Sequence, residues 1–276
     1  MSTVVQILTN NHFTPILFLS NNHIGCVSMI AADRQDEILK LILTQKCTNV
    51  KELCAAVYAS PATIRRDLRI LESKGYVRLQ YGNIIPLAEL PRELSLALRQ
   101  NQAKESKRLI ARYAASLITP NANVILDSSS SALLMADYIS AEAGITVFTN
   151  CIKAAVRLCE RNIDVYLIGG KIDNKNFCAD GAWTEEAVRS IHVDFFFFSS
   201  KAMDTDGNIS GQSEPGVHIR REMLSHSEKQ YFLCSSEKVG KTSTFALCNA
   251  SQLTGIITEK DIPEVPGTQV LIVPTK

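Results

Sequence analysis

Apolar residues recur at helical spacing three times within residues 33–75. An apolar stripe along one side predicts an amphipathic helix. The three predicted helices are Asp33–Gln45, Val50–Tyr58 and Ser60–Gly75. In the third, Ile64, Leu68 and Leu71 form the stripe, while Ser60 and Pro61 are residue types that favour a helix start.

A hairpin pattern follows the third helix. Residues Tyr76–Ile85 alternate between apolar and polar around Gly82-Asn83, which predicts two short strands joined by a turn. Three helices followed by such a wing are typical of a winged helix-turn-helix, in which the third helix enters the major groove of DNA. A helix whose basic face is only solvated is the alternative for the third helix alone, and the surrounding elements favour DNA binding.

Short apolar runs alternate with helical patterns between residues 124 and 273. The predicted strands are 124–127, 145–150, 165–170, 194–198, 230–234, 255–258 and 270–273, and the predicted helices are 132–141, 152–161, 184–190 and 214–226. Thr184 is the predicted cap of the third of these helices. Repeated strand–helix units predict an α/β fold with a mostly parallel sheet that helices cover on both faces.

The connection between these two regions reads as a linker and a helix. Two prolines in Pro86–Arg92 indicate a linker, and a single long helix is predicted from Leu94 to Ile118. Lys104, Lys107 and Arg108 are expected on the solvent side of that helix.

The chain is therefore expected to have four parts. They are an uncharged extension at 1–30, a winged helix-turn-helix at 31–86, a linker and connecting helix at 87–120, and an α/β domain at 121–276. The apolar run Pro15–Leu19 in the extension is far shorter than the about 20 residues of a membrane span. We expect the functional protein to begin at Met29, and a weak role at a membrane surface is the alternative for the extension.

Charge and cysteine usage narrow the functional classes. The formal net charge is +1, but residues 31–82 carry nine Lys and Arg against six Asp and Glu, while the remainder carries 20 against 22. The eight cysteines and five histidines have no spacing typical of a zinc site or a catalytic triad, so we expect no metal or cofactor. Without a signal peptide, the cysteines are expected to be reduced thiols of a cytoplasmic protein.

Small polar and basic residues follow the ends of the predicted strands. Asp127 leads into a run of four serines at the start of a helix, where hydroxyls and backbone N–H groups can hold a phosphate. Gly169-Gly170-Lys171, Lys201 and Lys238 follow later strands. Because the carboxyl ends of parallel strands meet at one edge of a sheet, these residues predict a site for an anionic, hydroxylated small molecule.

The N-terminal segments carry a resemblance to a known family. The runs Arg34-Gln-Asp-Glu-Ile-Leu, Val50-Lys-Glu-Leu, Ser60-Pro-Ala-Thr-Ile-Arg-Arg-Asp-Leu, Leu71-Glu and Gly75-Tyr-Val-Arg78 resemble the winged helix-turn-helix of the DeoR family of bacterial transcription regulators. Leu126-Asp127, Phe148-Thr-Asn150, Leu167-Ile-Gly-Gly170, Asp180-Gly181, the strand at Asp194 and Lys238-Val-Gly240 are similar in order to the effector domain of that family. The resemblance covers about 31–260.

This resemblance implies a repressor that senses a phosphorylated sugar through a domain similar to ribose-5-phosphate isomerase and coenzyme A transferase folds. The expected DNA contacts are Arg34, Ser60, Thr63, Arg65, Arg66, Arg69 and Arg78. The expected effector contacts are Asp127, Ser129, Ser130, Ser131, Thr149, Asn150, Gly169, Gly170, Lys171, Lys201, Glu214 and Lys238. The sequence departs from the family pattern at Gly82-Asn83, Ser129-Ser130-Ser131, Ser199, Ala202 and Ser235.

An enzyme is the alternative hypothesis. An isomerase-like fold would allow Asp127 or Glu214 to act as a general base on a sugar phosphate, with Lys238 binding the phosphate. Fold alone does not establish catalysis, and an N-terminal DNA-binding unit favours a regulator. One recognition helix reads a half-site, so we expect a homodimer or homotetramer bound to double-stranded operator DNA, with no membrane association.

Overall fold

The structure, a computed structural model, describes residues 31–45, 49–73, 76–80, 83–86 and 96–274. The predicted extension, the helix stop at Lys74-Gly75, Gly82 of the turn and most of the linker lie outside these residues. The chain forms two compact units. The first unit extends to Ile85 and the second begins at Pro86; residues 76–78 cluster with the second unit, although they belong to the hairpin described with the first.

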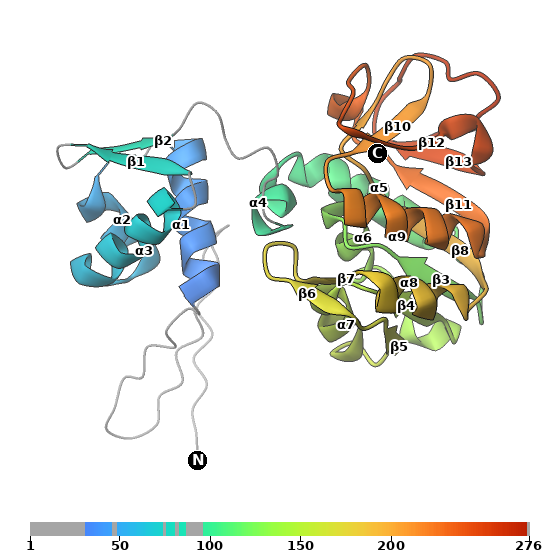
Figure 1. The fold of residues 1–276 in the computed structure, drawn as a ribbon, viewed down its shortest axis with the longest axis horizontal. Helices are drawn as coiled ribbons and strands as arrows, with labels where there is room; N and C mark the ends of the chain where they lie inside the picture. Colours follow the sequence, from blue (N-terminus) through green and yellow to red (C-terminus); the bar gives the residue numbers. More distant parts are fainter. Residues whose placement is uncertain (1–30, 46–48, 74–75, 81–82, 87–95, 275–276) are drawn as a thin grey trace. The chain divides into compact units, whose positions relative to one another are not determined.

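The N-terminal unit is a three-helix structure with a two-stranded hairpin, as Figure 1 shows. Its elements are α1 (Ala31–Gln45), α2 (Val50–Val57), α3 (Pro61–Ser73), β1 (Val77–Gln80) and β2 (Asn83–Pro86). Ile38, Leu53, Ile64 and Leu68 are buried, so the apolar stripes of all three helices face a common core. The predicted winged helix-turn-helix is confirmed.

Local capping explains where these helices begin and end. The Asn49 side chain accepts a hydrogen bond from the N–H of Glu52 (2.9 Å), and the Ser60 hydroxyl accepts one from the N–H of Thr63 (3.2 Å). Helix α2 ends one residue earlier than predicted because Tyr58 adopts a left-handed conformation (φ 50°), which turns the chain toward α3.

The C-terminal unit contains a seven-stranded parallel sheet in the order β14-β13-β11-β8-β3-β4-β5. These strands are β3 (Asn123–Leu126), β4 (Thr146–Thr149), β5 (Asp164–Leu167), β8 (Val193–Phe198), β11 (Ser227–Leu233), β13 (Gly255–Thr258) and β14 (Val270–Ile272). Strands β3, β4 and β5 follow one another toward one edge of the sheet, whereas β8, β11, β13 and β14 follow one another toward the opposite edge. The order therefore reverses between β3 and β8.

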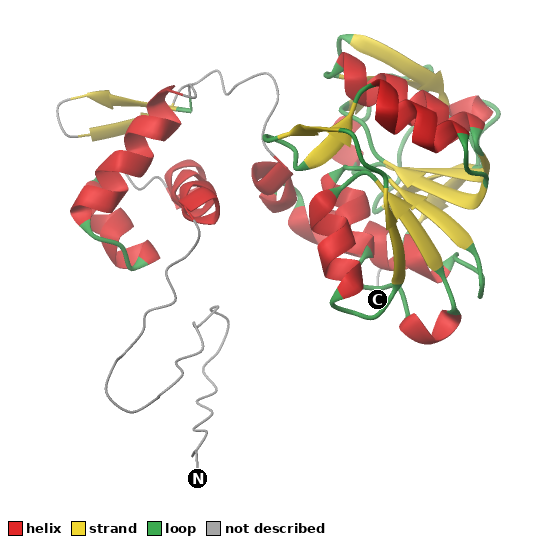
Figure 2. Ribbon diagram, turned by 60° about the horizontal axis from the view of Figure 1, so that its bottom comes forward, coloured by secondary structure: helices red, strands yellow, loops and turns green. Residues whose placement is uncertain are grey.

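Helices cover both faces of the sheet (Figure 2). They are α4 (Leu96–Asn101), α5 (Lys104–Ser116), α6 (Ser130–Met135), α7 (Ile152–Cys159), α8 (Ala182–Arg189) and α9 (Glu214–Ser225). On β8, Phe195 and Phe197 pack into a core with α5, α6 and α7, whereas Phe196 and Phe198 pack into the opposite core with α8 and α9. Burial on both faces explains why this strand is continuously aromatic, and it confirms the predicted α/β class.

Two smaller sheets were absent from the prediction. Strands β9 (Ala202–Met203), β10 (Asn208–Gly211) and β12 (Phe245–Asn249) form an antiparallel sheet, and β6 (Lys171–Asp173) pairs with β7 (Cys178–Asp180) as a hairpin. Their strands have two to five residues and mixed polarity, so they carry little of the apolar pattern that identifies the main strands.

The prediction of one long helix between Leu94 and Ile118 is wrong. Two helices, α4 and α5, occupy this segment, and Ala103 between them is left-handed (φ 46°, ψ 42°). Alanine is the best helix former, and only the backbone conformation of Ala103 breaks the helix, so the sequence pattern gave no signal. Helix α4 packs Leu96 against Leu133, Cys151 and Ala154.

No helix in the described part of the chain is long and apolar enough to cross a lipid bilayer.

Candidate DNA-binding surface and anion cavity

The outer face of α3 carries the predicted recognition residues. Arg65, Arg66 and Arg69 are exposed, while Ile64 and Leu68 are buried on the opposite side. Residues 65 and 69 lie four apart and therefore share one side of the helix. A convex helix face with three exposed guanidinium groups matches the dimensions and charge of a major groove. Their contact with DNA remains a prediction.

The N-terminal end of α3 and the wing add polar groups to this face. The hydroxyls of Ser60 and Thr63 lie 2.9 Å apart, and Arg78 is exposed on β1. A Glu72 carboxylate oxygen accepts a hydrogen bond from the N–H of Leu79 (2.7 Å), which attaches the wing to the end of α3. The wing is thereby fixed relative to the recognition helix.

Arg34 differs from the other predicted DNA contacts. Its Nε donates to Asp67 Oδ2 at 2.6 Å, and its side chain is only 15% exposed. Gln35 donates to the other oxygen of Asp67 at 3.1 Å. Asp67 lies in the middle of α3 and is buried, so this cluster fastens α1 to α3. The structure thus assigns Arg34 a role in packing the unit, and a DNA contact from it remains a prediction.

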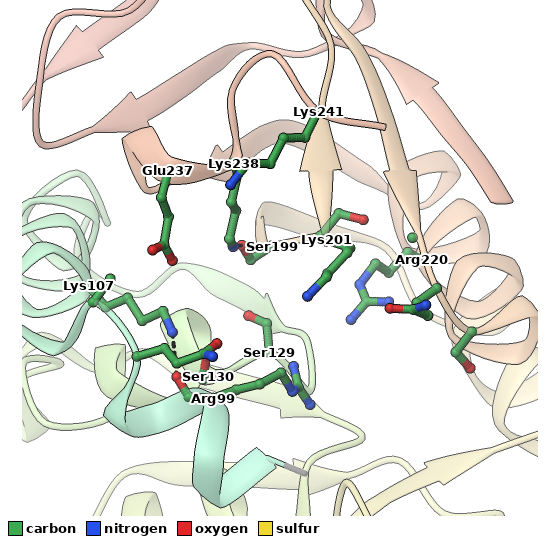
Figure 3. Close-up of a pocket in the computed structure, with 16 residues that line it drawn as sticks. Arg99, Lys107, Ser129, Ser130, Ser199, Lys201, Arg220, Glu237, Lys238 and Lys241 are labelled. Carbon is green, nitrogen blue, oxygen red and sulfur yellow. Dashed lines mark hydrogen bonds between the residues drawn. The ribbon is translucent and has the colours of Figure 1, made fainter. Parts of the chain in front are cut away.

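A cavity of about 490 Å³ lies at the carboxyl ends of β3 and β8, where the strand order reverses. Figure 3 shows side chains from α4, α5 and α9 and from the loops after β3, β8 and β11 directed toward it. Its lining residues are Arg99, Gln102, Ala103, Lys107, Ser129, Ser130, Ser199, Ser200, Lys201, Gly211, Gln212, Ser213, Arg220, Glu237, Lys238 and Lys241. Open α/β sheets bind ligands at this position.

The lining is strongly basic. Six Lys and Arg side chains face one acidic side chain, Glu237. Burial, together with the nearby charge of Lys238, lowers the pKa of Lys107 from 10.5 to about 7. Burial also lowers the pKa of Lys238, and the charge of Arg99 adds to that effect. These cations have lost hydration and repel one another. An anionic ligand would offset both penalties, so the cavity favours an anion.

Asp127 lies beneath the cavity and organises its floor. One carboxylate oxygen accepts from Arg220 Nε at 2.7 Å and from the N–H of Ser199 at 3.4 Å, and the other accepts from the N–H of Ser129 at 3.0 Å. The Asp127 side chain is 2% exposed. These contacts join the ends of β3 and β8 to α9 and hold Arg220 at the cavity.

A second chain of hydrogen bonds positions Lys238. Its ammonium donates to the Ser199 hydroxyl at 2.6 Å, and that hydroxyl donates to the carbonyl of Leu233 at 2.6 Å. The Ser199 hydroxyl therefore gives the ammonium an acceptor and contributes a polar group to the cavity.

Four of the twelve predicted effector residues line the cavity, namely Ser129, Ser130, Lys201 and Lys238. Three others are buried nearby. The Ser131 side chain is enclosed in α6, the Thr149 hydroxyl donates to the carbonyl of Leu126 (2.7 Å), and the Asn150 amide donates to the carbonyl of Ala179 (2.9 Å). Thr149 and Asn150 thus join neighbouring segments of the sheet edge and do not face the cavity.

The remaining predicted effector residues lie outside the cavity. Gly169 offers its carbonyl to the Thr184 hydroxyl (2.9 Å), and a Cβ on Gly170 would lie 2.0 Å from that same hydroxyl oxygen. Gly170 therefore permits close packing against α8. Lys171 and Glu214 are exposed at the starts of β6 and α9.

The predicted cap of α8 needs correction. Gly181 caps this helix with φ 95°, and Thr184 lies inside the first turn. The Thr184 hydroxyl donates instead to the carbonyl of Gly169 on the preceding segment.

Several lining residues were not predicted. Arg99 and Lys107 come from α4 and α5, Arg220 from α9, and Lys241 from the loop after β11. The expectation that Lys107 faces solvent is wrong, since it is 3% exposed, whereas Lys104 and Arg108 are exposed as predicted. A signal was present, because Lys107 falls on the same helical side as Ile110, Ala111 and Ala114, which are buried.

One further group of side chains in the described residues has the chemistry of metal ligands. Ligand atoms of Asp173, Cys178 and Asp180 lie within 4.8 Å of one another on the β6–β7 hairpin. Asp173 already accepts from the N–H of Lys175 (2.8 Å) and the amide of Asn176 (2.7 Å), which closes the hairpin turn. Burial raises the pKa of the Cys178 thiol to about 12, so this group gives no argument for a bound ion.

An exposed basic recognition helix beside a wing, in one chain with a parallel α/β unit that holds a basic cavity, defines a DNA-binding transcription regulator with a sensor domain. The sequence matches the DeoR-like helix-turn-helix domain over residues 34–86 and the DeoR C terminal sensor domain over residues 102–260. The chain belongs to the DeoR family of transcriptional regulators.

Individual relatives align over most of the chain. The HTH-type transcriptional regulator GolR of Listeria innocua is 28% identical over 235 residues, which are 85% of this chain and 92% of GolR. The L-fucose operon activator of Haemophilus influenzae is 29% identical over 232 residues, with 84% and 93% covered. A D-ribose-5-phosphate isomerase in complex with phospho-erythronic acid matches with a TM-score of 0.37 and 12% identity, over 49% of this chain and 54% of the isomerase.

Family membership decides between the regulator and enzyme hypotheses. DeoR-family proteins regulate transcription and are not enzymes, so the alternative of a sugar-phosphate isomerase is set aside. The isomerase likeness is too distant to argue for catalysis. The two carboxylates of that hypothesis are also unsuited, since Asp127 is buried against Arg220 and Glu214 lies outside the cavity.

Proposed function

We propose that this regulator represses an operon for the catabolism of a sugar or related metabolite and that a phosphorylated sugar relieves the repression. The observation that carries this proposal is the cavity, in which six basic side chains and several hydroxyls surround a space of about 490 Å³. A phosphate monoester would bind the basic groups, and the sugar hydroxyls would bind serines. The name of one relative, the L-fucose operon activator, supports a sugar operon as the target.

The DNA part of the proposal places Arg65 and Arg66 in the major groove of an operator in the cytoplasm. Changing either to alanine should weaken operator binding by about 1–3 kcal/mol and relax sequence preference if that arginine reads a base. If it contacts phosphate only, binding should weaken on all sequences and the salt dependence should flatten by about one unit of slope. Arg112→Ala, an exposed arginine on α5, is the matched control. Unchanged affinity in both variants would contradict the assignment.

The proposed active form is a homodimer or homotetramer, because a single recognition helix reads one half-site. Large exposed apolar side chains support a contact between copies at the β5 edge of the sheet. Tyr166 and Leu167 lie on β5, Ile172 on β6, and Trp183 on α8 is 83% exposed. We expect the Trp183→Glu variant to form an assembly of lower mass than wild type, as measured by light scattering. A wild-type monomer on its own operator would refute this part.

The effector part is tested with a panel of sugar phosphates. The active compound should raise the melting temperature and weaken operator binding, because a ligand must favour one state in order to regulate it. Lys238→Ala should remove both responses while the variant stays folded. No shift with any phosphorylated sugar would argue against a phosphorylated effector.

A further inference from the structure

The connecting helices contribute two cations to the cavity. Arg99 lies in the last turn of α4, and Lys107 lies in the second turn of α5. The left-handed Ala103 between the helices breaks their axis, so that both residues line the same space. Figure 3 shows Arg99 and Lys107 on one side of the cavity and Lys201 and Lys238 on the other.

Lys107 connects the cavity to α4 directly. Its ammonium donates a hydrogen bond to the carbonyl of Arg99 in the last turn of α4, where a cation also interacts favourably with the helix dipole. An ammonium has three donors, so this bond leaves others available for a ligand. Its charge state therefore affects both the cavity and the end of α4.

Several contacts of its described residues hold helix α4 on the sensor unit. Leu96 packs in a small apolar cluster, and its N–H donates to the carbonyl of Lys175 at 3.4 Å. Arg99 donates to the Asn176 side chain at 2.7 Å. A six-residue helix has little stability of its own, so its position depends on these contacts and on the bond from Lys107.

The charge around Lys107 is unfavourable without an anion. Its side chain is buried, and the cations of Lys238, Arg99 and Lys201 all oppose its protonation, while Glu237 favours it. A doubly charged anion in the cavity would reverse this balance and keep the ammonium charged. A charged ammonium donates a stronger hydrogen bond to the Arg99 carbonyl than a neutral amine does.

We propose that Arg99 and Lys107 bind the anionic group of the effector, so that the bound anion holds α4 against the sensor unit. This rests on the proposed function and adds its regulatory step. The ligand class is a phosphate monoester or another compact dianion. Helix α4 is the first described element after residues 87–95, which follow the wing in sequence. The anion would therefore set the conformation of the chain where it enters the sensor unit.

The test measures binding of inorganic phosphate to the full chain by calorimetry at pH 7.5. Lys107→Met and Arg99→Gln should each weaken phosphate binding by about tenfold or more, as expected for a lost hydrogen bond to a charged group. Lys104→Met and Arg108→Gln are exposed on α5 and should bind within about twofold of wild type. Hydrogen exchange of the α4 amides should slow on phosphate addition in wild type and in the two controls only.

The outcomes separate this inference from the function on which it rests. If wild type does not bind phosphate, both fail. If wild type binds and Lys238→Ala does not, but Lys107→Met and Arg99→Gln bind like the controls, the cavity stands and the role of α4 and α5 is refuted. Should Lys107→Met not fold, Arg99→Gln decides, because its side chain is only half-buried.

Discussion

Each unit of this regulator contains a largely buried arginine–aspartate pair, and the two pairs have similar distances and exposure. Arg34 and Asp67 approach to 2.6 Å with side chains 15% and 3% exposed. Arg220 and Asp127 approach to 2.7 Å with side chains 14% and 2% exposed. In both, the carboxylate lies on or beside an element of the core and the guanidinium comes from a helix.

Their surroundings give the two pairs different roles. Asp67 takes its further hydrogen bond from Gln35, so the whole cluster joins α1 to α3. Asp127 takes further bonds from backbone N–H groups at the ends of β3 and β8, and its arginine lines the cavity. The same pair thus stabilises a helix contact in one unit and positions a ligand-facing cation in the other. Pair geometry alone therefore does not identify a functional site.

The largest expected effect is on the N-terminal pair. Asp67→Ala leaves the half-buried Arg34 without its carboxylate, and we expect it to lower the free energy of unfolding of this unit by about 3–5 kcal/mol. Hydrogen exchange of α1 and α3 amides measures the loss within the unit. Glu52→Ala, an exposed acidic change on α2, should stay within about 0.5 kcal/mol of wild type. A loss no larger than that of Glu52→Ala would show that the pair does not fasten the helices.

For the pair of Arg220 and Asp127, we expect a smaller loss of stability together with tighter phosphate binding. Asp127→Asn keeps one acceptor for the Ser129 N–H but removes the negative charge beside Arg220, so we expect a loss of about 1.5–3 kcal/mol in the sensor unit. Phosphate binding measured by calorimetry should become tighter, because Arg220 is no longer neutralised. Asp67→Asn should leave phosphate binding unchanged. Weaker binding in Asp127→Asn would mean that this carboxylate positions Arg220 more than it neutralises it.

The smallest expected effect is a difference between the two units in how their stability depends on pH. The pKa of Lys107 is lowered to about 7 in the folded chain from 10.5, so the unfolded chain binds more protons between these values. The stability of the anion-free sensor unit should therefore rise with pH from about 7 to 10, by at most about 1.4 kcal/mol per pH unit. Denaturant unfolding at several pH values measures this slope, and Lys107→Met should reduce it.

The N-terminal unit is the internal reference for that titration. No lysine is buried among the side chains described there, so its stability should change little over the same range. Equal slopes in the two units would contradict the assignment of the effect to Lys107. Phosphate should show the opposite trend, binding more weakly as the pH rises above 7, since the anion requires the charged amine.

Local signals made the N-terminal unit predictable from sequence. The capping of α3 by Ser60, the proline after it and the stripe of Ile64 and Leu68 all act within a few residues, and the helix begins where they indicate. The role of Asp67 was not predictable in this way, because its partner Arg34 lies 33 residues earlier. A charged residue between two arginines on a basic helix gives no sequence signal of burial.

The sensor unit was predictable in its sheet but only partly in its cavity. Continuous apolar runs such as Phe195–Phe198 identified strands buried on both faces, and serines and lysines after the strands lie at the edge where the cavity is found. Arg220 lies 93 residues from Asp127 and reaches the cavity only through the placement of α9. Arg99 arrives through the left-handed turn at Ala103, which residue type alone does not predict.

The composite wall of the cavity has a consequence for how regulators of this architecture diverge. One side is built by loops that follow core strands and depend on packing of the sheet, whereas the other includes α4, whose Leu96 packs in a small cluster. Substitutions at Arg99 or Gln102 alter the contacts offered to a ligand without disturbing either large core. A lineage can therefore exchange one metabolite for another by changing this short helix, while the folding stability of the domain is inherited intact.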